Sequence, residues 1–547
     1  MNGPVRSHWR GAGFIMLLVL VAAGALAPPA HGQVLYGSIV GEVRDSTGGL
    51  LPGATITVTN QETKATRETV SSASGAYRFP ALQPGTYTVV VKMDGFQSFT
   101  RRDVPVTLNT VARVEAALGV GQLQESVTVS AAERPVLQTD RAEVRHELRS
   151  RELTDLPIPV GRNYQELFRT LPGFTPPADA HSVPSNPSRA LVFNVNGASR
   201  SSNNTRIDGV SSTNTWLPHV VAYVPALESI ETVNVVTNNF DAEQGLAGGA
   251  AISVQIKSGT NTLRGSAFEY HFNEKMRAKN YFTPAGTNKG KWLDNQYGGT
   301  LGGPIRQNKL FYFLSYEGTR QKRNVPNTIS VPSAAVRQGD FSATGTTIYD
   351  PATGSADGSG RTPFPGSVIP ANRISPVAQK LLSYMPMPNL RNADGTVPES
   401  NNYFVQPLFI FNRWTVDSKV NWNASQRLQI FGRYSQLNFY QNNETLLGDQ
   451  LQGSPGAGGN PGIGWGDTYN FSGGANYTLA NNLVMDANFG WVRMGSNVEM
   501  NDLKENKGLD WLGIPGTNGP DKWDGGTPYF DLDTYADLGT TEDFMPY

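Results

Sequence analysis

The chain has 547 residues and a formal net charge of −1, with 38% hydrophobic and 17% charged residues. This length predicts several domains, and the near-neutral balance excludes the overall positive field that attracts nucleic acid. The sequence contains no cysteine, which excludes disulfide bonds, thiolate catalysis and cysteine-ligated zinc.

The first 32 residues have the pattern of a secretory signal peptide. Arg6 and Arg10 precede an apolar run at 13–27, and Ala30 and Gly32 place small residues at a cleavage site. A membrane-anchoring helix is the alternative. No later stretch reaches the ~18 apolar residues of a spanning helix, so any further membrane crossing is expected to use strands.

Residues 33–120 predict a small β-sandwich. Short alternating runs, including GSIVGEVRD, ATITVTN and GTYTVVVK, are separated by turn residues such as Pro84-Gly85. Residues 121–149 read as a linker. Within it, a short β-prone run has two interpretations: an edge strand, which the residues alone favour, or a peptide that adds itself to a partner's sheet. The run comprises Glu125, Ser126, Val127, Thr128, Val129, Ser130 and Ala131.

Residues 150–260 predict an α+β unit. Tyr164, Leu167, Phe168 and Leu171 have helical spacing. An Asp208-Gly209 turn separates two strands, and a short helix over Leu227 and Ile230 leads into another strand. A polar loop, SRSSNNTR, lies at 199–206.

Residues 261–547 predict part of an antiparallel β-barrel. In NRWTVDSKVNWN at 412–423, Trp414, Val416, Val420 and Trp422 share one face, which is expected to face lipid. Charged residues occupy the other face, where Asp417 and Lys419 are expected to face a wet lumen. Eight steps between the tryptophans span about 26 Å, or roughly 20 Å after tilting, near the ~25 Å apolar band of outer-membrane barrels. In the segment at 426–439, Phe431 breaks this pattern by joining Arg433 on the polar face. A soluble sandwich with a tryptophan core is the alternative.

Strands are expected near residues 265, 297, 310, 412, 427, 468 and 483, with long loops at 320–408 and 441–466. A membrane barrel closes on itself.

Several motifs carry a family resemblance. LPGATITV and SGAYRFPALQPGTYTVVV resemble the carboxypeptidase regulatory-like domain, an immunoglobulin-like or transthyretin-like sandwich without catalytic residues. LPIPVGRNYQELFRTLPG, NGASRSSNNTRIDGV, ALESIETVNVVTNNFDAEQG and GGAAISVQIKSGTNTLRGSAFEY together resemble the plug domain and first barrel strands of TonB-dependent outer-membrane receptors. LGGPIRQNKLFYFLSYEG extends the resemblance into the barrel, and the subgroup it indicates is the Oar-like type.

The resemblance implies energised import across the outer membrane, with the sandwich in the periplasm. Its implied partners are TonB with the inner-membrane energising complex, outer-membrane lipid, and an extracellular small-molecule, glycan or peptide substrate; carbohydrate is one candidate, and no nucleic acid is expected. It raises Glu125–Ala131 to a candidate TonB box, although many receptors carry that box at the mature N-terminus. Arg200, Asn203, Asn204 and Arg206 become a candidate substrate-facing plug loop, and Trp414, Trp422 and Trp491 become membrane-interface residues.

Enzymatic chemistry is not expected, and neither is a cofactor. The only metal-like spacing is His271-x-x-Glu274, which lies in an alternating segment and is read as an ordinary strand histidine. The rival function is a non-transporting surface, adhesion or export-related protein. A third expectation concerns completeness: seven strands fall short of the about 22 of such transporters, so the chain is expected to be a fragment or a truncated receptor.

Overall fold

The computed structural model describes residues 36–108, 110–121, 126–130, 143–159, 161–240, 247–459, 461–480 and 483–539. The predicted signal peptide lies outside them. Among the described residues, none of the helices combines the length and apolar character needed to cross a membrane. The chain is mainly β, as predicted.

The first unit is a sandwich of two sheets. Its strands are β1 Gly37–Asp45, β2 Thr55–Asn60, β3 Thr66–Val70, β4 Ala76–Leu82, β5 Gly85–Lys92, β6 Ser98–Val106, β7 Val111–Arg113, β8 Ala116–Leu118 and β9 Ser126–Ser130. One sheet has the order β4–β1–β7 with β8 also on β1, and the other has the order β3–β2–β5–β6–β9. Alternation places Ile56, Val58, Val89 and Val91 in the core between the sheets, where all four are fully buried.

The structure differs from the predicted linker at both of its ends. Strand β9 pairs in parallel with β6, from Ser98 opposite Ser126 to Arg102 opposite Ser130. The run predicted as a candidate TonB box therefore forms an edge strand of the sandwich, except for Glu125 and Ala131, which lie outside the described residues. At the other end, Val144–Arg149 forms a strand of the next sheet, because its backbone pairs with a buried neighbour.

The second unit contains a five-stranded sheet of order β10–β15–β16–β13–β14, here called the plug sheet. Its strands are β10 Val144–Arg149, β13 Asn204–Ile207, β14 Val210–Ser211, β15 Ile230–Asn238 and β16 Ala251–Ile256. Around it lie α2 Ser150–Asp155, η2 Tyr164–Thr170, η3 Arg200–Ser202, η4 Leu227–Ser229 and the paired short strands β11 Ala178–Asp179 and β12 Leu191–Val192.

The helix predicted over 164–171 is a 3-10 helix, capped by the Asn163 side chain and ended before Pro172-Gly173. It buries Tyr164, Leu167 and Phe168 against the plug sheet, as helical spacing predicted.

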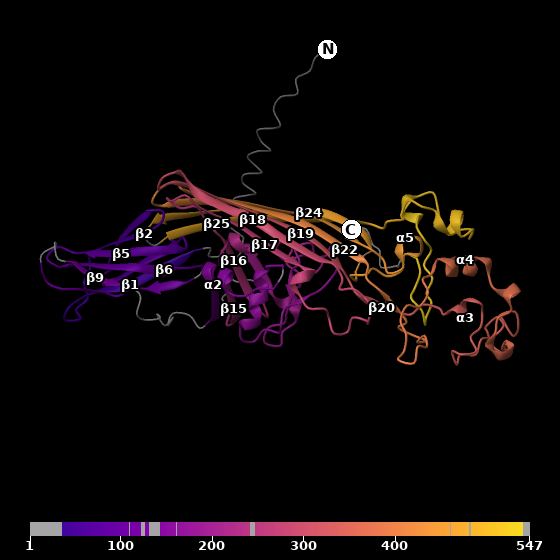
Figure 1. The fold of residues 1–547 in the computed structure, drawn as a ribbon. Helices are drawn as coiled ribbons and strands as arrows, with labels where there is room; N and C mark the ends of the chain where they lie inside the picture. The colour runs from indigo at the N-terminus through magenta and orange to yellow at the C-terminus, as the bar shows by residue number, and fades with distance from the viewer. Residues whose placement is uncertain are drawn as a thin grey trace, which may run out of the picture.

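The third unit is a seven-stranded antiparallel sheet, here called the wall, with strands in chain order. Its strands are β17 Arg264–Asn273, β18 Trp292–Arg306, β19 Leu310–Asn324, β22 Leu408–Asn423, β23 Leu428–Asn443, β24 Gly462–Ala480 and β25 Leu483–Glu499. All seven strands predicted from the sequence are present. Figure 1 shows the wall arching over the plug sheet, with the sandwich beyond one end.

The connections of the wall differ sharply in length at its two ends. At the end facing the sandwich, residues 307–309 and 424–427 suffice, whereas 274–291, 325–407 and 444–461 connect strands at the other end. The long connections and the C-terminal segment carry β20 Asn327–Ile329, β21 Tyr403–Val405, η6 Glu274–Met276, α3 Ala334–Arg337, η7 Pro365–Ser367, η8 Ala371–Arg373, α4 Pro376–Tyr384, α5 Gly448–Leu451, the π-helical turn η9 Lys507–Trp511 and η10 Lys522–Asp524.

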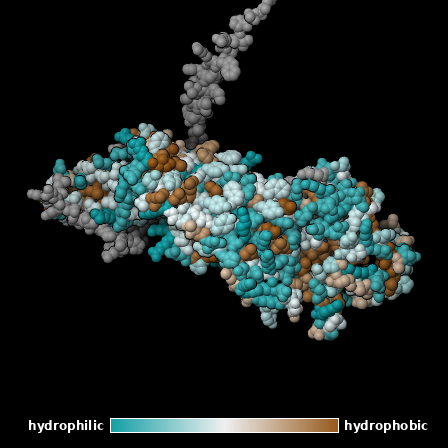
Figure 2. Space-filling model, turned by 45° about the horizontal axis from the view of Figure 1, so that its top comes forward, coloured by the Kyte–Doolittle hydropathy of each residue, from teal (hydrophilic) through white to brown (hydrophobic). Residues whose placement is uncertain are grey.

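Outer-membrane barrels place long loops outside and short turns in the periplasm. By this rule, the long-loop end is expected to be the extracellular end and the sandwich is expected to lie at the periplasmic end. On the face drawn in Figure 2, the long-loop end is mostly hydrophilic, with smaller hydrophobic patches, as suits loops in water.

Candidate functional site: the boundary between the plug sheet and the wall

The polar face predicted for residues 412–423 points into the arch of the wall. Arg413, Asp417 and Lys419 are buried there, while Val420 and Trp422 on the opposite face are exposed. The predicted orientation of the strand is correct. The expectation that Asp417 and Lys419 face a wet lumen is wrong, because the plug unit fills this space and contacts both side chains.

Asp208 is the centre of the first charged cluster. It sits in the two-residue turn between β13 and β14, and it adopts a left-handed φ of 44° that aspartate tolerates in such turns. Its carboxylate lies 2.9 Å from Lys419 Nζ and 3.1 Å from Arg433 Nε, both on the wall. Lys419 Nζ also donates to the Ile256 carbonyl at 3.0 Å, so two wall cations are held by one turn of the plug sheet.

A second cluster joins the two bodies near Glu317. Arg162 of the plug unit lies 2.9 Å from Glu228 and 3.8 Å from Glu317 of the wall. Arg413, also of the wall, lies 3.7 Å from Glu317 and donates to the Ser188 carbonyl at 3.0 Å. Two arginines and two carboxylates thus alternate across the boundary.

A hydrogen bond from an uncharged side chain, that of Tyr223, also crosses the boundary between plug and wall. Tyr223 of the plug unit donates to Asp417 Oδ1 at 2.8 Å, and Ser435 donates to the same oxygen at 2.6 Å. Burial, followed by the Asp417 charge, raises the pKa of Tyr223 well above its ordinary value. The hydroxyl therefore remains protonated and keeps donating at physiological pH.

These contacts hold the plug by paired charges and hydrogen bonds in addition to apolar packing. Removing one partner of a buried ion pair costs roughly 3–5 kcal/mol because the other charge stays desolvated. Water solvates the same charged groups once it reaches them. The first separation of plug and wall is therefore costly, and the separated charges are then stabilised by hydration. The ion pairs link residues that lie far apart in the sequence, with 66 positions between Arg162 and Glu228 and 211 between Asp208 and Lys419, which is why local patterns did not reveal them.

The predicted substrate-facing loop is only partly a loop. Asn204 and Arg206 belong to β13, where Asn204 is buried. The Asn203 side chain donates to the carbonyls of Phe193 and Arg200 and accepts from the Ala250 amide at 3.0 Å, which is a structural role. Arg200 is exposed. Of the four residues, Arg200 is therefore the one with an exposed side chain, and Arg206 is half-buried.

Sequence reasoning missed a histidine pair beside Arg200. His181 Nε2 lies 2.6 Å from His219 Nε2, and the two rings come from separate loops of the plug unit. Partial burial, followed by the charge of Arg200, lowers the pKa of both imidazoles. Their convergence had no sequence signal, since 38 residues separate them.

His271, whose spacing to Glu274 resembles that of a metal site, has ordinary hydrogen-bond partners. His271 contacts Asn295 at 2.6 Å and Asn273 at 2.9 Å, and Glu274 accepts from the Trp292 amide at 3.2 Å. Across the described part of the chain, histidines and carboxylates form no group of three or more with metal-site geometry.

The predicted interface tryptophans lie on the outer side of the wall. Trp422 and Trp491 are exposed and Trp414 is half-buried. They belong to a broader exposed apolar surface, which includes Leu314, Tyr316, Val420, Tyr434, Phe471, Met485 and Phe489.

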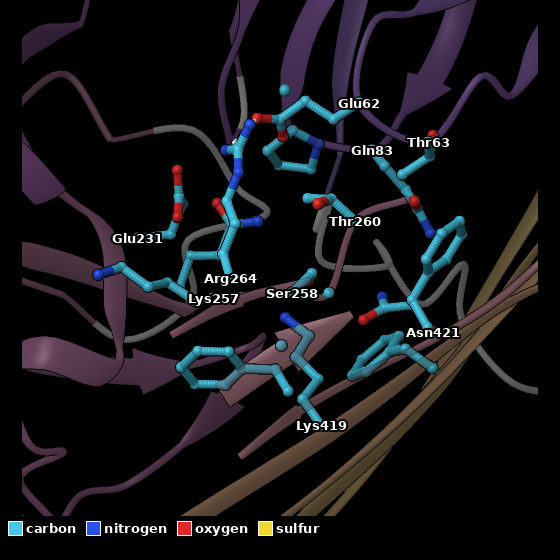
Figure 3. A pocket seen from close by; sticks show the side chains of 18 of the residues that line it. Glu62, Thr63, Gln83, Glu231, Lys257, Ser258, Thr260, Arg264, Lys419 and Asn421 are labelled. Atoms are coloured by element: carbon cyan, nitrogen blue, oxygen red, sulfur yellow. Dashed lines mark hydrogen bonds and ion pairs between the residues drawn. The ribbon is translucent and has the colours of Figure 1, made fainter. Parts of the chain in front are cut away.

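A cavity of about 400 Å³ opens at the sandwich end of the boundary. Figure 3 shows its three sources: Glu62 and Gln83 from the sandwich, Glu231 and Lys257 from the plug unit, and Lys419 from the wall. We call this cavity the vestibule.

Comparisons with known families agree with this architecture. Residues 255–546 match the family model described as outer membrane beta barrel domain, which covers more than half of the chain. Residues 38–119 match the carboxypeptidase regulatory-like domain.

A curated relative is the TonB-dependent transporter Oar of Myxococcus xanthus, 28% identical over 315 residues. The match covers 54% of this chain but only 28% of the transporter.

The solved structures that match include outer-membrane proteins, with TM-scores below 0.5. They include the outer membrane transporter YddB from Escherichia coli, with 13% identity, a TM-score of 0.39, and coverage of 65% of this chain and 40% of that chain. The ferric enterobactin receptor PfeA from Pseudomonas aeruginosa has 12% identity, a TM-score of 0.36, and coverage of 72% and 44%.

The family of the wall places the protein in the outer membrane. The matched family model is a membrane barrel and the curated relative is a transporter, which points to a protein without enzymatic activity. From the barrel match over more than half of the chain, the protein belongs to the outer-membrane β-barrel family, and its sandwich match and its identity to Oar show that it is similar to the Oar-like TonB-dependent receptors.

Proposed function

We propose that this chain forms the sandwich, plug and first wall strands of a receptor that imports substrate across the outer membrane with energy delivered by TonB. The observation that carries the proposal is the paired, buried boundary between plug and wall. A plug held by charges such as those of Asp208, Lys419 and Arg433 needs work to leave, and water solvates it once it has left.

The work is proposed to enter through residues 125–131. TonB is expected to pair with this run by strand addition, in which main-chain hydrogen bonds supply the affinity. Strand β9 already has extended backbone and forms one end of its sheet. From Ser130 the chain leads to β10, the end strand of the plug sheet, so a pull on β9 would be transmitted directly to the plug.

Substrate is proposed to meet the plug at its extracellular side, where Arg200, His181 and His219 lie together. A positive side chain beside two imidazoles favours a ligand with anionic or hydrogen-bond-accepting groups. The residues that bind or transport substrate carry out no covalent chemistry in this mechanism.

Proline substitution tests the role of β9. In the intact receptor, Thr128→Pro with Val129→Pro removes two adjacent backbone donors, so strand addition fails whichever edge is used. We expect binding of the purified periplasmic domain of TonB, measured by calorimetry, to fall below detection.

The matched control replaces the same two residues by alanine, which keeps both backbone donors and is expected to bind like the unaltered receptor. A surface or adhesion protein would behave differently, because residues 125–131 would then be dispensable. Unchanged TonB binding by the proline variant would contradict the proposal.

A further inference from the structure

Phe431 is the exception in its strand, an aromatic side chain on the inward polar face next to Arg433. The structure shows what occupies that position. Tyr36 and Leu108 of the sandwich pack on Phe431, and all three side chains are buried. Lys419 Nζ lies 5.7 Å from the centre of the Phe431 ring, which extends the contact to the charged boundary.

Polar contacts surround this apolar centre on the wall side. Glu62 of the sandwich lies 3.3 Å from Arg264 at the start of β17, and the Glu62 carbonyl accepts from the Asn261 amide at 3.2 Å. Arg67 donates to Asn476 Oδ1 at 3.5 Å near the end of β24. The sandwich therefore contacts the periplasmic rim of the wall at two separate strands, the first strand β17 and the last but one, β24.

The sandwich also contacts the plug sheet at β10. Thr107 donates to Glu147 Oε2 at 3.0 Å, and Arg145 donates to the Leu108 carbonyl at 3.3 Å. Leu108 thus meets the wall with its side chain and the plug with its backbone. An apolar centre with polar contacts around it is the usual anatomy of a specific protein interface.

Several residues of these contacts also line the vestibule, among them Leu108, Phe431 and Arg264. Its volume of about 400 Å³ is comparable with pockets that hold small molecules. Figure 3 shows Glu62, Thr63 and Gln83 of the sandwich on the side opposite Lys419 and Asn421 of the wall. Substrate that passes between plug and wall would reach this cavity before the periplasm, and the sandwich forms one of its sides.

We propose that the sandwich is a cover over the periplasmic mouth of the receptor, docked on Phe431, and that it must leave this docking site before substrate can exit. The proposal rests on the proposed import function for its purpose, but the docking itself does not depend on it. The periplasmic rim of the wall is thus covered by the sandwich of the same chain. In this proposal the sandwich is not a free spacer, and this surface of the wall is not a docking site for another protein.

Thiol accessibility tests the cover directly. Because the chain has no cysteine, Ser258→Cys introduces a single thiol into the vestibule. In the purified intact receptor, N-ethylmaleimide is expected to react with it freely. A maleimide on a polyethylene glycol chain too large for the cavity is expected to react slowly.

Phe431→Ser removes the docking site from the wall without touching the sandwich core. When Phe431→Ser is added to Ser258→Cys, the rate at which the large reagent modifies the thiol is expected to rise by about tenfold or more. The reason is that the packing of Tyr36 and Leu108 on Phe431 is lost. Leu108→Ser should do the same from the sandwich side. Leu50→Ala, on an exposed sandwich residue, is the matched control and should change nothing.

Equal rates for the large reagent with and without Phe431→Ser, whether both fast or both slow, would overturn the cover. The assay contains neither TonB nor substrate. Failure of the proposed import would therefore leave its result unchanged, and the two failures are distinguishable.

Discussion

At the scale of single residues, Asp208 pairs one turn of the plug sheet with two cations of the wall. One carboxylate in a tight turn pairs with both Lys419 and Arg433, and all three side chains are buried. The turn was predictable from Asp-Gly. The partners were not, because nothing in the local pattern states which inward-facing charges of the wall meet which turn of the plug.

Replacing Asp208 by asparagine is expected to weaken the plug strongly. Two cations would remain buried without a carboxylate, at a cost of roughly 3–5 kcal/mol. The measurement is the urea concentration at which half of the plug is released from the intact receptor. Release is detected as proteolytic cleavage within residues 150–260.

The double variant Asp208→Asn with Lys419→Met removes one of the stranded charges and should recover part of the loss. A single variant as stable as the unaltered receptor would show that this cluster does not hold the plug.

The histidine pair predicts a pH dependence at the extracellular side of the plug. The folded pKa of both His181 and His219 is lowered below the ordinary value of about 6.5, so the folded state binds fewer protons than the unfolded state. The stabilisation of neutral imidazoles is present above the unfolded pKa and is lost as pH falls through the lowered folded pKa.

Protonation is then expected to separate the rings, since each would repel the other and Arg200. Imidazole NMR shifts of the two residues measure this titration, and Arg200→Gln should raise both pKa values. Titration of either imidazole above the ordinary value would contradict this prediction.

At the scale of elements, alternation predicted most of the wall. Each of the seven strands was found near its expected position, and Trp422 and Lys419 face opposite sides as the period of two requires. Phe431 was seen as an exception but could not be explained, because its partner Leu108 lies in another domain. The substrate-facing loop stays a prediction. In the structure Arg200 is exposed, whereas Asn204 is buried by sheet pairing that short polar residues do not signal.

The outward face of β22 predicts a cost that depends on depth. Val416→Arg places a charge near the middle of the strand, where about 2–4 kcal/mol is expected, whereas Trp422→Arg near its end should cost only about 0–1 kcal/mol. Urea unfolding of the intact receptor in lipid vesicles measures both, with Val416→Ala and Trp422→Ala as size controls. A larger cost at 422 than at 416 would mean that this face does not contact lipid in the expected register.

At the scale of the whole molecule, we propose that the sandwich, the plug sheet and the wall form one route for force and another for substrate. Force is proposed to enter at β9, which is part of the sandwich, and to reach the plug through β10. Substrate is proposed to pass the charged boundary and then the vestibule. Because β9 and Leu108 belong to the same sandwich, a pull on β9 would draw on the cover and on the plug together.

The measurement that tests this account most directly is the exposure of the plug–wall boundary in energised cells. Thr468 is fully buried on the inward face of β24, so Thr468→Cys in this cysteine-free chain reports when the plug separates from the wall. A membrane-impermeant maleimide is expected to label it in growing cells that contain TonB, and not in cells that lack TonB or carry the proline pair at 128 and 129. Equal labelling with and without TonB would contradict energised movement of the plug.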